Sequence, residues 1–350
     1  MNVFVYEHLT GGGCFSGSPP TVPSGSLLAE GRAMVEAVAI DFARAGCEIV
    51  TQWDARLQSC GIDLDQVSPV MVDSATAEKS AFERLAAEAD WTIAIAPEID
   101  DSLFRRVQLV EDVGGRLLGP GLEAVRRASD KWQTYQALVV NGVQTPDTWL
   151  IGDNGDLKIE AHDRVVLKPR WGAGSVGVRL YGPKIPRPSS GGLVGQPFCE
   201  GTPASVAFLL GPGICQPLTP CRQRLSRDGR FQYGGGCMPL APALQLRAAE
   251  LGQAAIDAVI GAARGYVGID LILGDNADGS DDYVIEVNPR LTTSYVGLRK
   301  ACMINLARAM IDVANGKPAT LRFDDKPLQF DTNGKVWWVE DDVRNGLLGD

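Results

Sequence analysis

The sequence predicts an α/β protein, α+β when its whole length is considered, and three observations lead to this fold class. In residues 1–125, short apolar runs alternate with stretches whose apolar side chains recur every three or four positions, which is typical of a parallel sheet covered by helices. Residues 148–215 have the pattern of short strands joined by turns. Beyond them, a long helical stretch precedes two apolar strands that each carry a polar inward position. A chain of 350 residues is too long for one small core, so we expect two or three packed units.

The N-terminal unit is predicted from its alternating segments. These are the strands Asn2–Tyr6, Cys47–Thr51 and Trp91–Ala96 and the helices Leu27–Ala45 and Glu78–Ala89. The loop Thr10–Pro23, which is rich in Gly, Ser and Pro, follows the first strand. Open parallel sheets bind their ligands at this carboxyl edge of the strands, so we expect the loop to border a ligand site.

After a short helix, the pattern changes from alternating strands and helices to short strands joined by turns. Ser129 or Asp130 is the expected N-cap of this helix, which ends at Asn141–Gly142. The further elements expected are the strands Arg164–Lys168, Val176–Tyr181, Leu193–Phe198, Ser205–Leu210, Val267–Leu273 and Tyr283–Asn288, and the helices Ala243–Ala262 and Met303–Ala314. Gly182–Gly192 is predicted to be a loop, Gly274–Asp282 an acidic turn, and Val336–Val339 a strand or packing segment of the tail.

Composition excludes several classes of function. The formal charge of −10 argues against non-specific binding to nucleic acid or to an anionic membrane. No apolar stretch approaches the ~20 residues of a membrane span, and the start has no signal-peptide pattern. The 8 cysteines are scattered without a CxxC pair, which is typical of reduced thiols, so we expect a soluble, cytoplasmic protein. His8 and His162 are the only histidines and lie in no triad or zinc motif, so the chemistry must rest on carboxylates, lysines, arginines and a bound cofactor.

The strongest candidate site lies in two apolar strands, GIDLIL and VIEVNPR. Alternation along paired strands places Asp270, Glu286 and Asn288 on one face. Two carboxylates and an amide oxygen are hard-oxygen ligands of the kind that Mg²⁺ takes. The alternative is that both carboxylates point to water, which the apolar flanks disfavour. The acidic turn between the strands lacks the ligand spacing of an EF-hand and is expected to be a solvated turn.

A glycine-rich segment, VVLKPRWGAGSVGV, gives a second candidate site. Gly172, Gly174 and Gly177 satisfy GxGxxG, but a strand rather than a helix is expected after them. This context favours a strand–loop–strand flap whose backbone N–H groups bind phosphate oxygens. Lys168 just before the loop would add a positive charge, the alternative being an ordinary surface lysine.

Other candidates carry weaker signals. Lys131 at the helix start would by default be a solvated lysine, and Leu193–Val206 is a hairpin whose turn could be an interlobe hinge. Arg222, Arg224 and Arg290 are the arginines that could neutralise a phosphate or clamp a carboxylate. Arg290 is the best placed because it ends the VNPR segment, whereas Arg224 could equally be a surface residue.

The order of these motifs resembles the ATP-grasp family over residues 125–315. Within that family the whole chain resembles the archaeal tyramine–L-glutamate ligases of methanofuran biosynthesis. The segments that carry this resemblance are FVYEHLTGG, IAPEID, ASDKWQTYQAL, PLTPCRQRLSRDGRFQYGGG, GYVGIDLIL and IEVNPRLTTSYVGL. The resemblance implies a parallel α/β pre-grasp domain (1–125), the two lobes of the ATP-grasp fold (126–195 with the flap, 196–318 with the metal site) and a C-terminal tail (319–350).

The resemblance also implies roles for matching positions. Residues expected to bind the ATP phosphates are Lys131, Lys168, Gly172, Gly174 and Ser175. The hinge Gln196–Gly201, with Gln196 and Phe198, would contact adenine. Asp270, Glu286 and Asn288 would hold two Mg²⁺ or Mn²⁺ ions. Many members carry a ribose-binding Glu just after the hinge, where this chain has Pro203, and Glu200 is the candidate to replace it.

The implied reaction joins an acid to an amine at the expense of ATP. The γ-carboxylate of glutamate would attack the γ-phosphate, and the acyl phosphate would then meet tyramine or a similar aromatic amine such as tyrosine. Arg290 would stabilise the tetrahedral intermediate and Arg222 would clamp a substrate carboxylate. The partners expected are small molecules, with no nucleic acid or membrane, and a homodimer is common in similar proteins.

Two alternatives stay open. An ATP-grasp ligase for another acid and amine, such as an L-amino-acid ligase or a D-alanine–D-alanine-like ligase, would have the same metal ligands. The residues around Glu7–Gly13, Arg222–Arg224 and Thr292–Tyr295 would discriminate among such ligases. A nucleotide-binding regulatory protein without turnover belongs to a different class, and the presence of both lysines and all three metal ligands argues against it.

Overall fold

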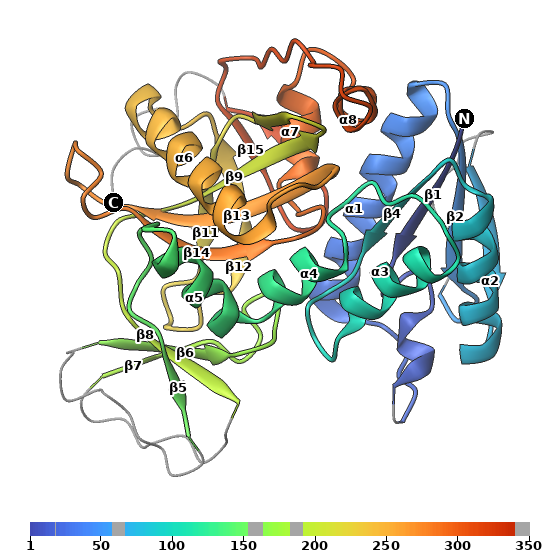
Figure 1. Ribbon diagram of the computed structural model, residues 1–350, viewed down its shortest axis with the longest axis horizontal. Coiled ribbons are helices and arrows are strands. Elements are labelled where there is room, and N and C mark those ends of the chain that lie inside the picture. Colours follow the sequence, from blue (N-terminus) through green and yellow to red (C-terminus); the bar gives the residue numbers. More distant parts are fainter. Residues whose placement is uncertain (18, 58–66, 153–163, 183–191, 340–350) are drawn as a thin grey trace.

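The computed structural model describes residues 1–17, 19–57, 67–152, 164–182 and 192–339. Most of the expected loop Gly182–Gly192, His162, Cys60 and the last 11 residues lie outside the described ranges. Three sheets organise the molecule (Figure 1): an N-terminal parallel sheet, a small antiparallel sheet and a central eight-stranded sheet. The predicted fold class, a parallel α/β unit followed by a two-lobed α+β part, is confirmed.

The N-terminal sheet has four parallel strands in the order β3-β2-β1-β4. Its elements are β1 (Asn2–Glu7), β2 (Glu48–Asp54), β3 (Val67–Val72), β4 (Trp91–Ile95), α1 (Gly25–Arg44), α2 (Ala75–Glu88), α3 (Ser102–Asp112) and the 3-10 turn η1 (Gly13–Ser16). The sequence did not predict β3 or α3. Strand β3 lies at the sheet edge, contains Pro69 and is largely exposed, so its apolar pattern is weak.

The small sheet forms the lobe at the lower left of Figure 1. Its antiparallel order β5-β8-β6-β7 is built from β5 (Trp149–Ile151), β6 (Val165–Pro169), β7 (Arg179–Tyr181) and β8 (Leu193–Pro197). Two short helices, α4 (Leu122–Ser129) and α5 (Lys131–Val140), connect it to the N-terminal unit. Asp130 caps α5 by accepting hydrogen bonds from the N–H groups of Trp132 and Gln133, whereas Ser129 ends the unpredicted helix α4.

The central sheet carries the rest of the chain in the order β14-β13-β9-β11-β12-β15-β16, with β10 paired to β9. Its strands are β9 (Thr202–Gly211), β10 (Ile214–Pro217), β11 (Cys221–Leu225), β12 (Tyr233–Met238), β13 (Gly265–Leu273), β14 (Tyr283–Asn288), β15 (Leu328–Phe330) and β16 (Val336–Trp338). Two strands of the predicted C-terminal tail join this sheet, since β15 pairs with β12 and β16 pairs with β15.

Three helices accompany the central sheet, and two differ from the expected bounds. Helix α6 (Pro242–Ala255) ends earlier than predicted and continues as the π-helical turn Ile256–Ile260. Helix α8 (Leu306–Ala314) begins three residues late because Asn305 accepts a hydrogen bond from Arg308 N–H and caps it. The short helix α7 (Tyr295–Ala301) was not predicted.

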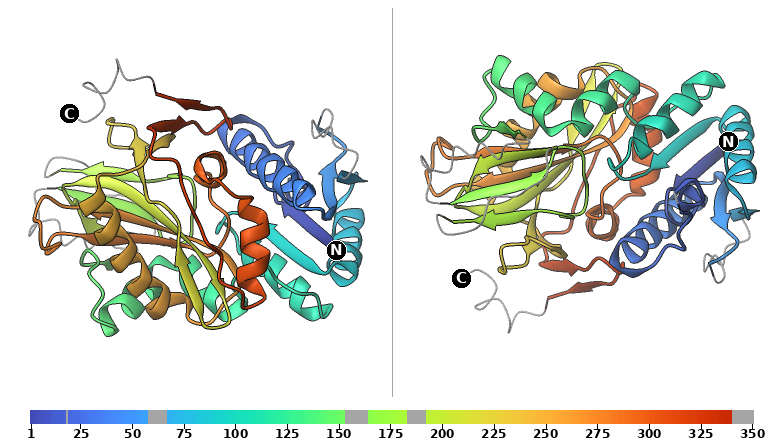
Figure 2. Two further views of the ribbon diagram at one scale, coloured as in Figure 1. Left: turned by 90° about the horizontal axis from the view of Figure 1, so that it is seen from above. Right: turned by 90° about the horizontal axis from the view of Figure 1, so that it is seen from below.

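One buried carboxylate, Asp41 of α1, joins the N-terminal unit to the central lobe. It accepts hydrogen bonds from Tyr295 Oη at 2.9 Å and Arg299 Nε at 2.8 Å, and its carbonyl accepts one from Asn305 Nδ2 at 2.8 Å. Helices α7 and α8 accordingly pack beside α1 (Figure 2). In the described ranges, no helix is both long and apolar enough to cross a membrane.

Candidate active site

A single cavity of about 450 Å³ lies where the three sheets meet. The small sheet and the central sheet line one end of it, which we call the nucleotide end. The N-terminal unit closes the other end, which we call the acceptor end, with residues from β1, α1 and the segment after β4. The volume is within the range of small-molecule sites.

The nucleotide end contains the predicted oxygen-rich face. Asp270 of β13 lies directly opposite Glu286 of β14, and both line the cavity with Asn288. Asp270 accepts hydrogen bonds from Gln223 Nε2 at 2.8 Å and Asn288 Nδ2 at 3.0 Å. The predicted convergence of the three side chains on one face is therefore observed, and the alternative of strand carboxylates pointing to bulk water is wrong.

Burial and charge give the two carboxylates different proton affinities. Burial first, and then the neighbouring charge of Glu286, raise the pKa of Asp270 to about 7. Burial also acts to raise the pKa of Glu286, but the positive charges of Lys131 and Lys168 outweigh it and the pKa is lowered. The two neighbouring carboxylates, Asp270 and Glu286, therefore favour a cation beside them.

Both predicted lysines reach this face. Lys131 Nζ forms an ion pair with Glu286 Oε1 at 2.7 Å and donates a hydrogen bond to the Gly172 carbonyl at 2.9 Å. Lys168 is buried and donates to the Ile285 carbonyl at 3.3 Å. Burial lowers the pKa of Lys168 to about 8, with Lys131 also lowering it and Glu286 opposing both. The default alternative for Lys131, a solvated helix lysine, is therefore wrong, since its side chain is only 9% exposed.

The glycine-rich segment forms the strand–loop–strand flap that the sequence predicts, between β6 and β7. Gly174, Ser175 and Gly177 have φ values of 64°, 60° and 77°, a left-handed backbone that glycine adopts without strain. Ser175 Oγ donates to the Phe231 carbonyl at 2.8 Å. The flap is thereby held closed over the cavity against the loop between β11 and β12.

The hinge between β8 and β9 contributes to the cavity only in part. Gln196 is buried, lines the cavity and donates to Thr148 Oγ1 at 2.8 Å. Phe198 lines it as well and stacks on Phe231 at a centroid distance of 6.0 Å. Glu200 does not line the cavity, because its exposed side chain turns to Arg164 in an ion pair.

Apolar groups surround the space beside this hinge. They are Val166, Pro197, Ile272 and Ile285. Apolar lining in a cavity that also contains the two lysines suits a nucleotide base whose phosphates point to the charged face.

Arg290 lines the cavity at the boundary of its two ends, and a residue that sequence reasoning missed holds it. Glu98 accepts from Arg290 Nε at 2.8 Å and from Nη2 at 3.0 Å. Both side chains are largely buried, at 12% and 4% exposure, so the bidentate pair fixes the guanidinium. The segment IAPEID contained Glu98, but its partner lies 192 residues away in the chain, so no local pattern could reveal the pair.

The other two candidate arginines are not brought to the cavity. Strand alternation turns Gln223 of β11 toward Asp270, so the adjacent Arg222 projects to the opposite face and does not line the cavity. Arg224 instead donates to the Gly234 carbonyl at 2.6 Å. The two arginines were predicted as candidate site residues because of their charge. The pairing of β11 with β9 determines which face each side chain occupies, and it places Gln223 on the cavity side.

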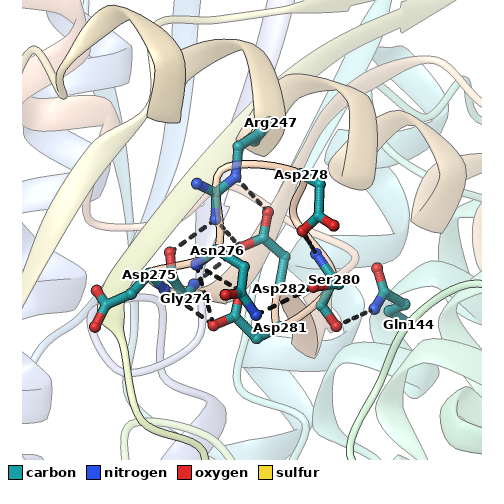
Figure 3. A network of polar contacts seen from close by, with 9 residues as sticks. All are labelled: Gln144, Arg247, Gly274, Asp275, Asn276, Asp278, Ser280, Asp281 and Asp282. Atoms are coloured by element: carbon teal, nitrogen blue, oxygen red, sulfur yellow. Dashed lines mark hydrogen bonds and ion pairs between the residues drawn. The ribbon is translucent and has the colours of Figure 1, made fainter.

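The turn between the two ligand-bearing strands is fixed by a polar network (Figure 3). Arg247 of α6 binds Asp282 and donates to the Gly274 carbonyl at 2.8 Å. Gly274 N–H donates to Asp282 Oδ1 at 2.8 Å, and Gln144 Nε2 donates to the Ser280 carbonyl at 2.9 Å. These bonds link the acidic turn to α6 and to the segment after α5.

The acceptor end was predicted in part. The segments around Glu7–Gly13 and Thr292–Tyr295 were expected to discriminate substrates and both contribute to the lining, whereas Glu30 was not predicted. The polar residues of this end include Glu7 at the end of β1, His8 just after it, Glu30 of α1, Asp100 of the segment after β4, and Thr293 of the loop after β14. Its apolar lining consists of Leu9, Leu27, Met34, Ile95, Ala96, Pro97 and Ile99. Glu7, His8 and Leu9 line the cavity just before the predicted loop Thr10–Pro23, but no residue of that loop is among the lining residues.

The donor set at the nucleotide end fits a divalent cation. In the described part of the chain, no group of three or more His, Cys, Asp or Glu side chains has a metal-holding arrangement. Asp270, Glu286 and Asn288 together provide two carboxylates and one amide. The Lys131 ammonium group already places a positive charge against Glu286. Hard oxygen donors of this kind suit Mg²⁺ or Mn²⁺ with phosphate oxygens completing the shell.

Comparison with known families identifies the class. The ATP-grasp domain model matches residues 128–294, and the pre ATP-grasp 3 domain model matches residues 47–125. Tyramine–L-glutamate ligase of Methanocaldococcus fervens is 30% identical over 239 residues, which are 68% of this chain and 70% of that protein. The chain belongs to the ATP-grasp family of carboxylate–amine ligases, enzymes that use ATP and divalent metal ions.

Further relatives agree with this family. Tyramine–L-glutamate ligase of Methanocaldococcus jannaschii is 29% identical over 243 residues, 69% of this chain and 67% of that protein. An ATP-grasp superfamily structure from Archaeoglobus fulgidus has a TM-score of 0.72 and 24% identity, covering 95% of this chain and 92% of that one. The L-amino acid ligase of Bacillus licheniformis has a TM-score of 0.67 at 17% identity, covering 94% and 78%, and shares the fold.

Proposed function

We propose that this enzyme joins the γ-carboxylate of glutamate to tyramine, or to a similar aromatic amine such as tyrosine, through an acyl phosphate. The observation that supports this most is the single cavity in which phosphate-binding groups and an amine-compatible pocket meet at Arg290. Two relatives that bear the name tyramine–L-glutamate ligase support the choice of substrates.

The first half of the reaction belongs to the nucleotide end. Lys131 and Lys168 bind phosphate oxygens of ATP, and the backbone of Gly172, Gly174 and Ser175 covers them from the flap. Asp270, Glu286 and Asn288 would hold two Mg²⁺ or Mn²⁺ ions, which when bound would supply positive charge to the transferring phosphoryl group. The carboxylate oxygen of the acid attacks the γ-phosphorus, ADP leaves, and an acyl phosphate results.

The second half takes place beside Arg290. The amine nitrogen attacks the acyl carbon, a C–N bond forms, and the C–O bond to phosphate breaks. Arg290 is oriented by Glu98 and stabilises the oxyanion of the tetrahedral intermediate. The closed flap keeps water from hydrolysing the acyl phosphate. No side-chain nucleophile is needed in this scheme.

The lining of the acceptor end supports an aromatic amine. Leu27 and Met34 of α1, together with Ile95 and Ile99, line the same cavity as Glu30. Apolar side chains can pack on an aromatic ring while a nearby carboxylate receives an ammonium group.

The experiment is phosphate release with ATP, Mg²⁺ and L-glutamate, with and without tyramine or tyrosine, in wild type and Glu286→Gln. We expect phosphate and a glutamyl amide only with the correct amine, and neither in the variant. If no amine produces phosphate release although ATP still binds, the glutamate–amine pair is excluded. Another acid and amine, or a regulatory protein without turnover, would then be favoured.

A further inference from the structure

Any amine substrate must enter this cavity as a cation and react as a neutral molecule. A primary aliphatic amine has a pKa near that of lysine, about 10.4, so at neutral pH roughly one molecule in a thousand carries a free lone pair. The attack on an acyl phosphate therefore needs a group at the acceptor end that binds an ammonium ion and takes its proton. The carboxylates of the cavity are the candidates.

Four of the five carboxylates that line the cavity can be set aside. Glu286 is paired with Lys131, and Asp270 accepts two side-chain hydrogen bonds at the nucleotide end. Asp100 is exposed at the surface of the molecule. Glu7 is buried, and its carboxylate already accepts from Leu9 N–H, Thr10 N–H and the Thr10 hydroxyl, so it organises its own loop.

The fifth carboxylate, Glu30, has acceptor positions that no hydrogen bond within the described residues occupies. Its only hydrogen bond within the described residues comes from Thr293 Oγ1, at 3.3 Å from Oε2, and none of the ion pairs formed there involves it. One hydroxyl donor leaves most of the acceptor positions of a carboxylate open. A mostly buried, open carboxylate is costly unless a ligand satisfies it.

Glu30 also lies close to the reacting centre. Thr293, its hydrogen-bond donor, is three residues after Arg290, whose positive charge acts on the Glu30 carboxylate. The pKa of Tyr233 is raised well above its usual value by burial first, and the charges of Asp270 and Glu30 both add to this. Glu30, Asp270 and Arg290 all line the same cavity, so Glu30 shares the enclosed space of the catalytic groups.

Given the function proposed above, we infer that Glu30 binds the ammonium group of the amine substrate and is the general base of amide formation. The carboxylate accepts one proton from R–NH₃⁺ and leaves R–NH₂. The nitrogen lone pair forms the C–N bond, the C–O electron pair departs with phosphate, and the second N–H proton leaves with that phosphate. The proton on Glu30 returns to solvent when the products leave.

The charged surroundings of Glu30 favour this role. The titratable and charged groups that face the same end of the cavity are Glu7, His8, Asp100, Tyr233 and Arg290. Burial raises the pKa of Glu30, while the Thr293 hydrogen bond and the charge of Arg290 lower it. A raised carboxyl pKa makes a better proton acceptor, and the nearby cation Arg290 is already neutralised by Glu98.

Hydroxylamine provides the test, because it is small and largely unprotonated at neutral pH and so needs no base. The two reactions compared are hydroxamate formation from ATP, Mg²⁺, glutamate and hydroxylamine, and amide formation with tyramine. The variant is Glu30→Gln. The matched control is Glu36→Gln on the same helix, where Glu36 pairs with Arg32 at the surface.

We expect Glu30→Gln to lose about 100-fold in amide formation at pH 7, in line with the contribution of a general base. Its hydroxamate rate should stay within about twofold of wild type, and its amide rate should rise about tenfold per pH unit as free amine accumulates. Glu36→Gln should match wild type in both reactions.

Two results would overturn the role of Glu30: an equal loss of hydroxamate and amide formation, or no loss of either. An equal loss would mean that Glu30 positions the acid or the fold. Absence of hydroxamate in the wild-type enzyme would overturn the proposed function itself, and the role of Glu30 with it. Unchanged ATP binding in Glu30→Gln checks that the variant is folded.

Discussion

The two ends of the cavity differ in how the chain encodes them. The nucleotide end comes from three short segments, the helix start at Lys131, the flap after Lys168 and the β13–β14 pair, and each has a local pattern. The acceptor end takes single residues such as Glu30, Glu98 and Thr293 from distant parts of the chain. The difference teaches that phosphate chemistry can be recognised from motifs, whereas the choice of amine depends on long-range assembly.

The largest effect is expected at the nucleotide end, from Glu286→Gln. Loss of this charge removes the partner of Lys131 and one of the cation ligands, so phosphate release should fall by about 10³-fold. Steady-state phosphate release with saturating substrates measures it. Asp275→Asn, an exposed carboxylate in the turn of the same hairpin, is the control and should keep full activity. Equal losses in both variants would contradict a specific role of Glu286.

Lys168→Gln should give the next largest effect and separates the two ends kinetically. The change removes a buried positive charge from the phosphates, so KM for ATP should rise by about 100-fold while KM for the amine stays near wild type. Initial rates over both substrates measure this. Lys79→Gln alters an exposed lysine of α2 as a control. A rise in KM for the amine alone would place the role of Lys168 at the acceptor end and contradict this prediction.

Gly31→Ala should disturb only the acceptor end. A Cβ at this position in α1 would lie 2.5 Å from Cδ of Glu7, whose carboxylate is held by its own loop. Overpacking of this size costs about 1–3 kcal/mol, so KM for the amine should rise by about tenfold with KM for ATP unchanged. Gly119→Ala, where a Cβ meets no atom within 4 Å, is the control. An unchanged KM for the amine would show that Glu7 does not shape this end.

The remaining expected effect is on acid stability and not on substrate binding, and it comes from His8. Burial first, and then the charge of Arg106, lower the pKa of His8 from 6.5 to about 4 in the folded protein. Between these values the unfolded chain binds the additional proton, so the free energy of unfolding falls as pH decreases from about 6.5 to about 4. This contribution is at most about 3 kcal/mol.

The change His8→Gln should remove that part of the pH dependence. Urea unfolding at several pH values compares the two proteins, and wild type should lose more stability than the variant on acidification. Parallel curves for the two proteins would show that His8 is not held neutral by the fold.

Much of the fold could be predicted from the sequence, because the N-terminal strands and the β13–β14 pair have strong periodicity. Strand β3 and helix α7 could not, since one is an exposed edge and the other is short. At the site, motifs identified Asp270 and Glu286, but the phase of β11 that turns Gln223 inward is set by pairing with β9. Arg222 was predicted as a site residue because it is charged. Its charge does not reveal which face of β11 its side chain occupies.

The central claim is that an acyl phosphate links the two ends of the cavity. Transfer of ¹⁸O tests it most directly, with ATP, Mg²⁺, tyramine and glutamate labelled with ¹⁸O in both γ-carboxylate oxygens. The account predicts ADP, one ¹⁸O in each inorganic phosphate released and one ¹⁸O retained in the amide, as read by mass spectrometry. Amide formation with unlabelled phosphate, or with release of AMP and pyrophosphate, would contradict it.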